Sequence, residues 1–290
     1  MAILQICLAR DEKDDGIVEI ERRHSYMDKQ VMNDLVSIVM LSDKNGQYLI
    51  ETIRSVQAQT YENWELLYVD DSQKVDYLNV VLKEKEADSR IKVSAFVFKN
   101  GPARARTTAI REANGRWIAF IDAGDLWEPT KLERQIAFMK DHCYAVSYTK
   151  YGIIDRIGKR KGLVISGPEC IARAVMMKCY WSQLLTVMYD SEKIGKLSIP
   201  NLIENNGYAI MLLLAKKADC HLLDECLVIQ RAEKGKFNRV PIPLKFYWRY
   251  AAYRVVAGCS KIGAIARTFV NIYYTLVKRI KYVERLKAGN

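Results

Sequence analysis

The sequence places two pairs of carboxylates where an apolar run gives way to a turn. Asp122 and Asp125 follow a run of apolar and aromatic residues that contains no proline, the pattern of a buried strand. Asp70 and Asp71 follow a second, shorter apolar run upstream. Ligands of open α/β sheets bind outside the carboxyl ends of the strands, so acids in these positions can reach a ligand. The two pairs therefore predict a polar site at one edge of a sheet.

Alternating strands and helices are expected to position these carboxylates. The expected strands are 35–40, 64–69, 91–98, 115–121, 143–149 and 185–190. The helices expected from the apolar pattern are 48–59, 76–88, one after Pro129 and 168–178. A hairpin is expected over 150–166. Strands joined by crossover helices predict an α/β fold, with a mostly parallel central sheet covered by helices.

Four segments give this sequence a resemblance to the family 2 glycosyltransferases: 36–40, 51–61, 69–72 and 121–127. With its spacing preserved, the resemblance extends from about residue 35 to the region of residue 253. It implies a GT-A fold and an inverting transferase that takes its sugar from a nucleotide-diphosphate donor. The same resemblance implies a helix beginning near 103 and another over 208–212. It also implies a divalent metal, Mg²⁺ or Mn²⁺, that bridges the diphosphate oxygens.

The resemblance also implies roles for individual residues. Asp70, Asp71 and Asp122 would hold the nucleotide, and Arg106, near the start of a predicted helix, could face the diphosphate. The alternative for Asp70 and Asp71 is that they cap the following turn. For Arg106, the alternative is an exposed helix arginine that contacts no ligand.

Two positions depart from the family pattern. Gly124 stands where the family has its second, metal-holding Asp, so Asp125, one residue later, becomes the candidate metal ligand. Asn206 and Gly207 stand where the family has Glu-Asp, which leaves Glu204 as the candidate catalytic base. A general base typically contributes about 10²–10⁴ in rate. We therefore expect a weakened or absent metal requirement, and the activity itself stays open at this point.

Two functions fit these observations. The first is a cytoplasmic enzyme that moves a sugar from a nucleotide donor to a glycan or lipid-linked acceptor in cell-surface polysaccharide biosynthesis. The second is a catalytically silent relative that binds a nucleotide, a glycan or a partner transferase without turnover, because fold alone does not establish activity. A nucleic-acid-binding function would rest on basic charge alone, without any recognised module, and we do not expect it.

The resemblance and the distribution of charge predict three parts in the 290 residues: an N-terminal extension over 1–34, the glycosyltransferase-like domain over 35–240 and a basic, aromatic, helical segment over 241–290. Half of the residues are hydrophobic, enough for a sizeable core. The seven cysteines show no metal-type spacing and fit reduced thiols in a cytoplasmic protein. Residues 1–10 do not resemble a signal peptide, and no apolar run is long enough for a transmembrane helix.

The positive charge is concentrated at the C-terminus. From Lys245 onward there are ten basic residues and one acid, Glu284, out of a net charge of +11 for the chain. A helix over 268–287 would gather three apolar side chains on one face: Phe269, Tyr273 and Leu276. Its end would gather three basic side chains: Lys278, Arg279 and Lys281. This pattern predicts an interfacial helix on the anionic inner face of a membrane, whereas the aromatics of 246–253 are expected to pack back on the domain.

Overall fold

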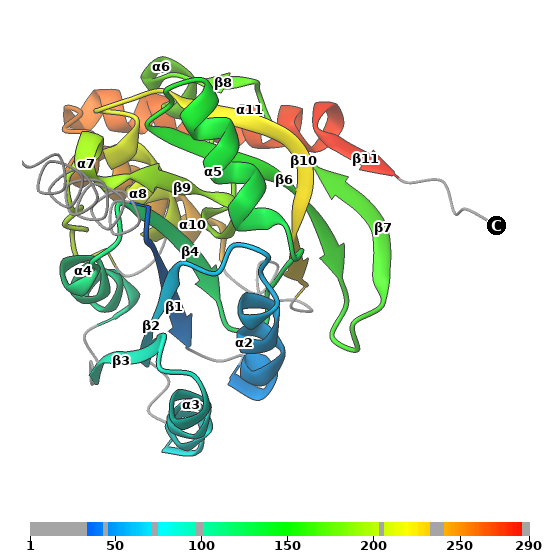
Figure 1. The fold of residues 1–290 in the computed structure, drawn as a ribbon. Helices are drawn as coiled ribbons and strands as arrows, with labels where there is room; N and C mark the ends of the chain where they lie inside the picture. The colour runs from blue at the N-terminus through cyan, green and yellow to red at the C-terminus, as the bar shows by residue number, and fades with distance from the viewer. Residues whose placement is uncertain are drawn as a thin grey trace, which may run out of the picture.

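The computed structural model describes residues 34–42, 46–70, 75–96, 101–202, 206–232 and 241–285. Two of the predicted site residues, Asp71 and Glu204, lie outside the described residues, as does almost all of the predicted N-terminal extension. The strands and helices named below lie within the described part of the chain (Figure 1).

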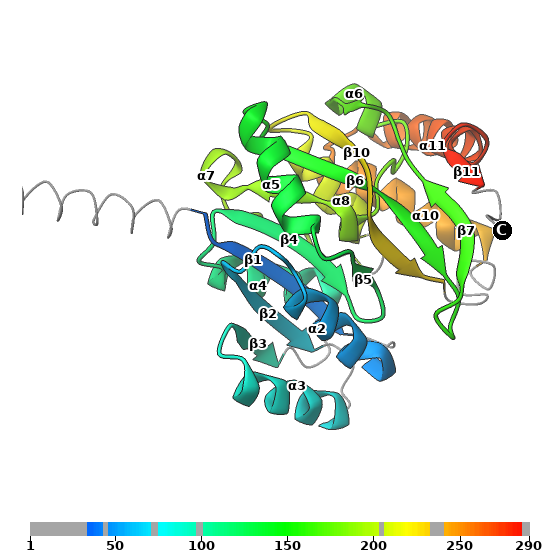
Figure 2. The same cartoon turned by 45° about the vertical axis from the view of Figure 1, so that its right-hand side comes forward.

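A central sheet runs through the molecule in the order β11-β7-β6-β9-β4-β1-β2-β3, and β10 joins it beside β6 (Figures 1 and 2). The strands are β1 (Val36–Ser42), β2 (Trp64–Asp70), β3 (Ile91–Phe96), β4 (Trp117–Asp122), β5 (Leu126–Trp127), β6 (Val146–Ile154), β7 (Arg160–Ile165), β8 (Cys170–Ile171), β9 (Met188–Asp190), β10 (Cys220–Arg231) and β11 (Val283–Arg285). The strands β3, β2, β1 and β4 are parallel, as predicted for the first half of the chain. Beyond them β9 runs antiparallel to both β4 and β6, so the second half of the sheet is mixed.

Helices cover both faces of the sheet. The helices are α2 (Leu49–Gln57), α3 (Val75–Ala87), α4 (Pro102–Glu112), α5 (Lys131–Asp141), α6 (Arg173–Met176), α7 (Ser191–Ile194), α8 (Asn206–Leu214), α10 (Ile242–Ala251) and α11 (Lys261–Lys281), with the short turns η1 (Gly46–Tyr48), η2 (Leu184–Thr186) and η3 (Ala252–Val256). The helix expected over 168–178 is wrong: that segment holds the short strand β8 and the single turn α6. The hairpin over 150–166 is confirmed by the antiparallel pairing of β6 with β7.

Alternate residues of the parallel strands explain the two layers. In β1, Ile38 and Met40 pack in one hydrophobic cluster with α2, α3 and α5, whereas Val39 and Leu41 pack in the other with α4 and α8. Successive side chains of a strand point to opposite faces, so a strand buried on both faces needs an unbroken apolar run. Every residue of β1 is buried, as this requires. The core therefore fixes the strands whose ends carry the candidate site.

The C-terminal segment packs on the same framework. Tyr253 in η3 is fully buried, and β11 pairs antiparallel with β7. The expectation that the aromatics of 246–253 pack back is confirmed for Tyr253, whereas the Tyr247 side chain is more than half exposed. In the described part of the chain, no helix is long and apolar enough to cross a membrane.

Candidate active site

Asp70 and Asp122 end the two strands that flank β1. Asp70 of β2 pairs with Ser42 of β1, and Asp122 of β4 pairs with the preceding residue, Leu41. The two carboxylate-bearing residues therefore lie at the carboxyl edge of the sheet, one residue apart in register and with one strand between them. Neighbouring strands lie about 4.8 Å apart, which separates their backbones by roughly 10 Å. Both residues therefore stand at the edge where ligands of open α/β sheets bind.

Arg106 forms an ion pair with Asp122. Its Nη2 donates to Asp122 Oδ1 at 2.5 Å, from a side chain that is 7% exposed to one that is 46% exposed. Arg106 projects from α4, whose first residue is a proline, the residue best suited to start a helix there. Neither a free helix arginine nor a cation aimed only at a ligand describes this arrangement. Arg106 fixes the orientation of a carboxylate that remains open to solvent.

The turn after Asp122 is built around the backbone of Gly124. Its φ of +104° is a conformation that L side chains rarely adopt. Its N–H donates to Thr52 Oγ1 at 2.9 Å, and its carbonyl accepts from Arg231 Nε at 3.0 Å. Glycine at this position therefore suits the turn as it stands, besides removing the carboxylate that the family carries.

Asp125 lies in the same turn, but its side chain is directed toward β10. It is buried, and its Oδ1 accepts from the backbone N–H of Arg231 at 2.9 Å. Its carbonyl accepts from Thr52 Oγ1, also at 2.9 Å. These contacts join the turn to α2 on one side and to β10 on the other. They are the contacts of a residue that positions the turn.

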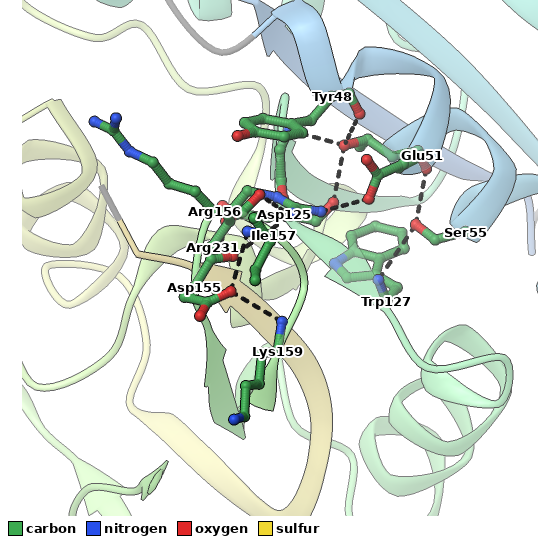
Figure 3. Close-up of polar contacts among 12 residues, drawn as sticks. Tyr48, Glu51, Ser55, Asp125, Trp127, Asp155, Arg156, Ile157, Lys159 and Arg231 are labelled. Atoms are coloured by element: carbon green, nitrogen blue, oxygen red, sulfur yellow. Dashed lines mark hydrogen bonds and ion pairs between the residues drawn. The ribbon is translucent and has the colours of Figure 1, made fainter. Parts of the chain in front are cut away.

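Arg231 is the centre of this network (Figure 3). Its Nη2 pairs with Glu51 Oε2 at 2.5 Å, and its Nη1 donates to the carbonyl of Arg156 at 3.1 Å. Its guanidinium lies over the ring of Tyr48, with 4.1 Å from Cζ to the ring centroid. The side chain is only 3% exposed, so these partners offset the cost of burying its charge. None of the sequence patterns described above pointed to Arg231, Glu51 or Tyr48 as members of this network.

The residues of this turn do not fit the divalent metal that the family implies. Asp122 already accepts a hydrogen bond from Arg106, Gly124 has no side-chain atom that could bind a metal, and Asp125 is buried against Arg231. Within the described ranges, no group of three or more His, Cys, Asp or Glu residues could hold a metal ion. The assignment of a metal to Asp125 stays a prediction that these contacts do not favour.

The start of α8 occupies the place of the family's acidic pair. A Cβ added to Gly207 would lie 2.5 Å from the Tyr180 hydroxyl and 3.3 Å from the Tyr180 Cζ. That hydroxyl accepts from the N–H of Leu184 at 2.8 Å, which holds the ring in place. Burial raises the pKa of Tyr180; the charge of Arg106 acts to lower this pKa, and the charge of Asp122 acts to raise it. Tyr180 therefore fills the space that a side chain at position 207 would need, and no sequence signal pointed to it.

Comparison with known proteins points to one family. The family model described as glycosyl transferase family 2 matches residues 37–193, more than half of the chain. A Bacillus subtilis protein named as a teichuronic acid biosynthesis glycosyltransferase, TuaG, is 32% identical over 198 residues, which cover 68% of this chain and 79% of that protein. An Escherichia coli protein, WfgD, named as a UDP-Glc:α-D-GlcNAc-diphosphoundecaprenol β-1,3-glucosyltransferase, is 35% identical over 63% of this chain and 70% of its own length.

Solved structures show the same fold. The crystal structure of S. aureus TarS residues 1–349 with UDP-GlcNAc matches with a TM-score of 0.62 and 17% identity, over 81% of this chain and 71% of that one. A mannosyltransferase from Pyrobaculum calidifontis, solved with GDP-Man and Mn²⁺, matches with a TM-score of 0.52 and 13% identity, over 88% and 76%. The extent of the family match, together with the identity to TuaG over most of its length, shows that this chain belongs to glycosyltransferase family 2.

Proposed function

We propose that the chain is an inverting glycosyltransferase that moves a sugar from a nucleoside diphosphate donor to a lipid-linked saccharide in surface-polysaccharide assembly. One observation carries the proposal: Asp70 and Asp122 both lie at the carboxyl edge of the sheet, on the two strands beside β1, and the exposed Asp122 is oriented by Arg106. Carboxylates held in this way accept hydrogen bonds from ribose hydroxyls and base N–H groups. The lipid-linked acceptor is supported by the name of WfgD, which specifies a diphosphoundecaprenol-linked sugar.

The proposed donor site consists of Asp70, Asp71 and Asp122, with Arg106 as a positioning residue. In the transfer, an acceptor hydroxyl oxygen bonds to the anomeric carbon while the bond from that carbon to the diphosphate oxygen breaks. The nucleoside diphosphate leaves with the electron pair, and the hydroxyl proton passes to a base on the opposite side. Glu204 stays the proposed base, because Asn206 cannot accept this proton as a carboxylate would and Gly207 has no side chain.

We further propose that donor binding depends less on a divalent metal than the family pattern implies. The support is Gly124 in place of the family's second Asp, together with the burial of Asp125 against Arg231. The reaction would take place at the inner face of the membrane, where a cytoplasmic nucleotide sugar meets a lipid-linked acceptor.

Calorimetric titration with UDP-, GDP- and dTDP-sugars, each with Mn²⁺ and with a chelator, tests the donor site. We expect one nucleotide class to bind, with affinity that changes less than about tenfold on chelation, and Asp122→Asn to weaken it. A prenyl diphosphate-linked N-acetylglucosamine then tests transfer, with product stereochemistry read by NMR. A hundredfold loss of affinity on chelation would overturn the proposed metal independence. Donor binding without any transfer or hydrolysis would favour the catalytically silent alternative.

A further inference from the structure

The C-terminal helix α11 presents an apolar face to the outside of the molecule. Eight large apolar side chains are exposed along it. Five of these form one stripe: Ile262, Phe269, Tyr273, Leu276 and Ile280. At about 100° per residue they lie within about 60° of one another, and the stripe is about 27 Å long. A surface helix ordinarily turns such a stripe toward the core. The shared face predicted for Phe269, Tyr273 and Leu276 is confirmed, and it points outward.

Small and polar residues form the inner face of α11. Ala264, Thr268 and Asn271 are buried, and Asn271 Nδ2 donates to the Tyr253 hydroxyl at 3.2 Å. Lys278 also turns inward, where its Nζ donates to the carbonyl of Tyr180 at 3.0 Å. Lys278 lies in the last turn of the helix, as expected, but its side chain does not join the exposed basic side chains there. Because hydrogen bonds fix the inner face, the apolar stripe is held outward by the fold.

The charges beside the stripe are all basic. Lys261, Arg267, Arg279 and Lys281 are exposed and lie about 90–150° from its centre, on both sides. Over residues 241–285 the sequence has nine basic residues and one acid, Glu284. An apolar stripe flanked by cations on both sides is the pattern of a helix that lies in the headgroup region of an anionic bilayer.

Charge also argues against a second copy of the chain as the occupant. Stacking two such faces would bring two sets of unopposed cations together, which is unfavourable. Near an anionic lipid surface, by contrast, each basic residue strengthens binding by about fivefold. Helix α10 extends the apolar surface, since Phe246 packs edge-on against Phe269 with ring centroids 5.3 Å apart and Ile242 is largely exposed.

We propose that the outward face of α11, extended by α10, docks the protein on a membrane surface rich in anionic lipid. The docked helix lies flat, and its inner face contacts Tyr180, whose hydroxyl lies against the start of α8 beside the candidate active site. The inference deepens the proposed function and rests on it for the lipid-linked acceptor. The docking itself does not require sugar transfer. Residues 261–281 are the segment that it concerns.

Vesicle flotation of the full chain tests the docking with a matched pair of variants. Ile280→Asp places a charge in the stripe, whereas Ile157→Asp places the same charge at the tip of the β6–β7 hairpin, and the two side chains are equally exposed, at 86% and 88%. We expect binding to phosphatidylcholine vesicles that contain phosphatidylglycerol and little binding to phosphatidylcholine alone. Ile280→Asp should weaken binding by about tenfold or more, the loss expected for one large buried aliphatic side chain, and Ile157→Asp should bind as wild type.

A second pair tests the charges. Arg279→Gln with Lys281→Gln should weaken binding and reduce its salt dependence, whereas Lys159→Gln with Lys161→Gln on the hairpin should change neither. Equal binding to both kinds of vesicle, or equal binding by the two aspartate variants, would overturn the proposal. So would light scattering that shows a dimer dispersed by Ile280→Asp, because the face would then join two copies. Donor titration without vesicles reads the active site separately: donor binding without docking refutes only this proposal, and docking without donor binding refutes only the proposed function.

Discussion

Asp125 offers the sharpest test, because a metal ligand and a positioning residue respond differently to the same substitutions. In the structure, its buried carboxylate accepts the backbone N–H of Arg231 and so ties the turn to β10. Asp125→Asn keeps an oxygen that can accept this bond, whereas Asp125→Ala leaves the N–H buried without that acceptor. A positioning role therefore predicts that the alanine variant loses much more stability than the asparagine variant.

The expected magnitude follows from the loss of the hydrogen bond to the Arg231 N–H. A hydrogen bond to a charged acceptor contributes about 1.5–3 kcal/mol, and leaving a buried donor unpaired costs a similar amount. We therefore expect Asp125→Ala to lower the free energy of unfolding by about 2–3 kcal/mol, and Asp125→Asn by less than about 1.5 kcal/mol. Urea unfolding followed by circular dichroism measures both, and equal slopes with respect to urea would show that only stability has changed.

Donor titration of the asparagine variant supplies the refuting result. If Asp125 positions the turn, Asp125→Asn should bind the donor with the same response to Mn²⁺ and to chelation as the wild type. If the variant folds as stably as the wild type but loses a Mn²⁺-dependent part of its donor affinity, Asp125 is a metal ligand and our interpretation of its burial is wrong.

Three further outcomes are expected. Gly124→Asp should lower stability by about 1–3 kcal/mol in urea unfolding without creating Mn²⁺-dependent donor binding, because φ at that position is +104°; a variant of full stability with metal-dependent binding would contradict this. Arg106→Met should weaken donor affinity about tenfold or more in calorimetry, roughly 1.4 kcal/mol, with partial rescue in Arg106→Lys, because the cation orients Asp122; equal affinities in all three proteins would remove its positioning role. Burial lowers the pKa of Lys278 to about 8, so above pH 8 the folded state loses this proton before the unfolded state does, and this group's contribution to stability rises with pH up to about 10.4. Lys278→Met should therefore flatten the rise in unfolding free energy between pH 8 and 10, and an unchanged slope would exclude this assignment.

The elements that the sequence predicted best are those with the strongest apolar periodicity. The strand before Asp122 and the helix α2 lie within a few residues of their predicted positions, because a buried strand or helix face requires such a pattern. The helix α8 also lies where it was expected, but that expectation came from the family resemblance. The helix expected over 168–178 was wrong because its apolar spacing is also compatible with the short strand β8 and the single turn α6. Strand β8 exists only through its pairing with β10, a contact that no local pattern encodes.

The candidate site was likewise predicted only in part. The sequence predicted the carboxylates at the sheet edge, since strand ends mark it, although it did not indicate that β1 separates Asp70 from Asp122. It could not predict the partners of Arg231, because Glu51 lies 180 residues away in the chain and nothing in its surroundings marks it as a partner.

Each of the two departures from the family pattern is matched by a feature of the structure around it. Gly124 sits in a backbone conformation that favours glycine, and the Tyr180 hydroxyl occupies the space beside Gly207. A carboxylate restored by substitution at either position would therefore meet strain or a clash, so the original geometry would not return. The loss of each acid is coupled to its surroundings, which is the reason to test the present turn and its buried Asp125 before attempting to rebuild the family's motif.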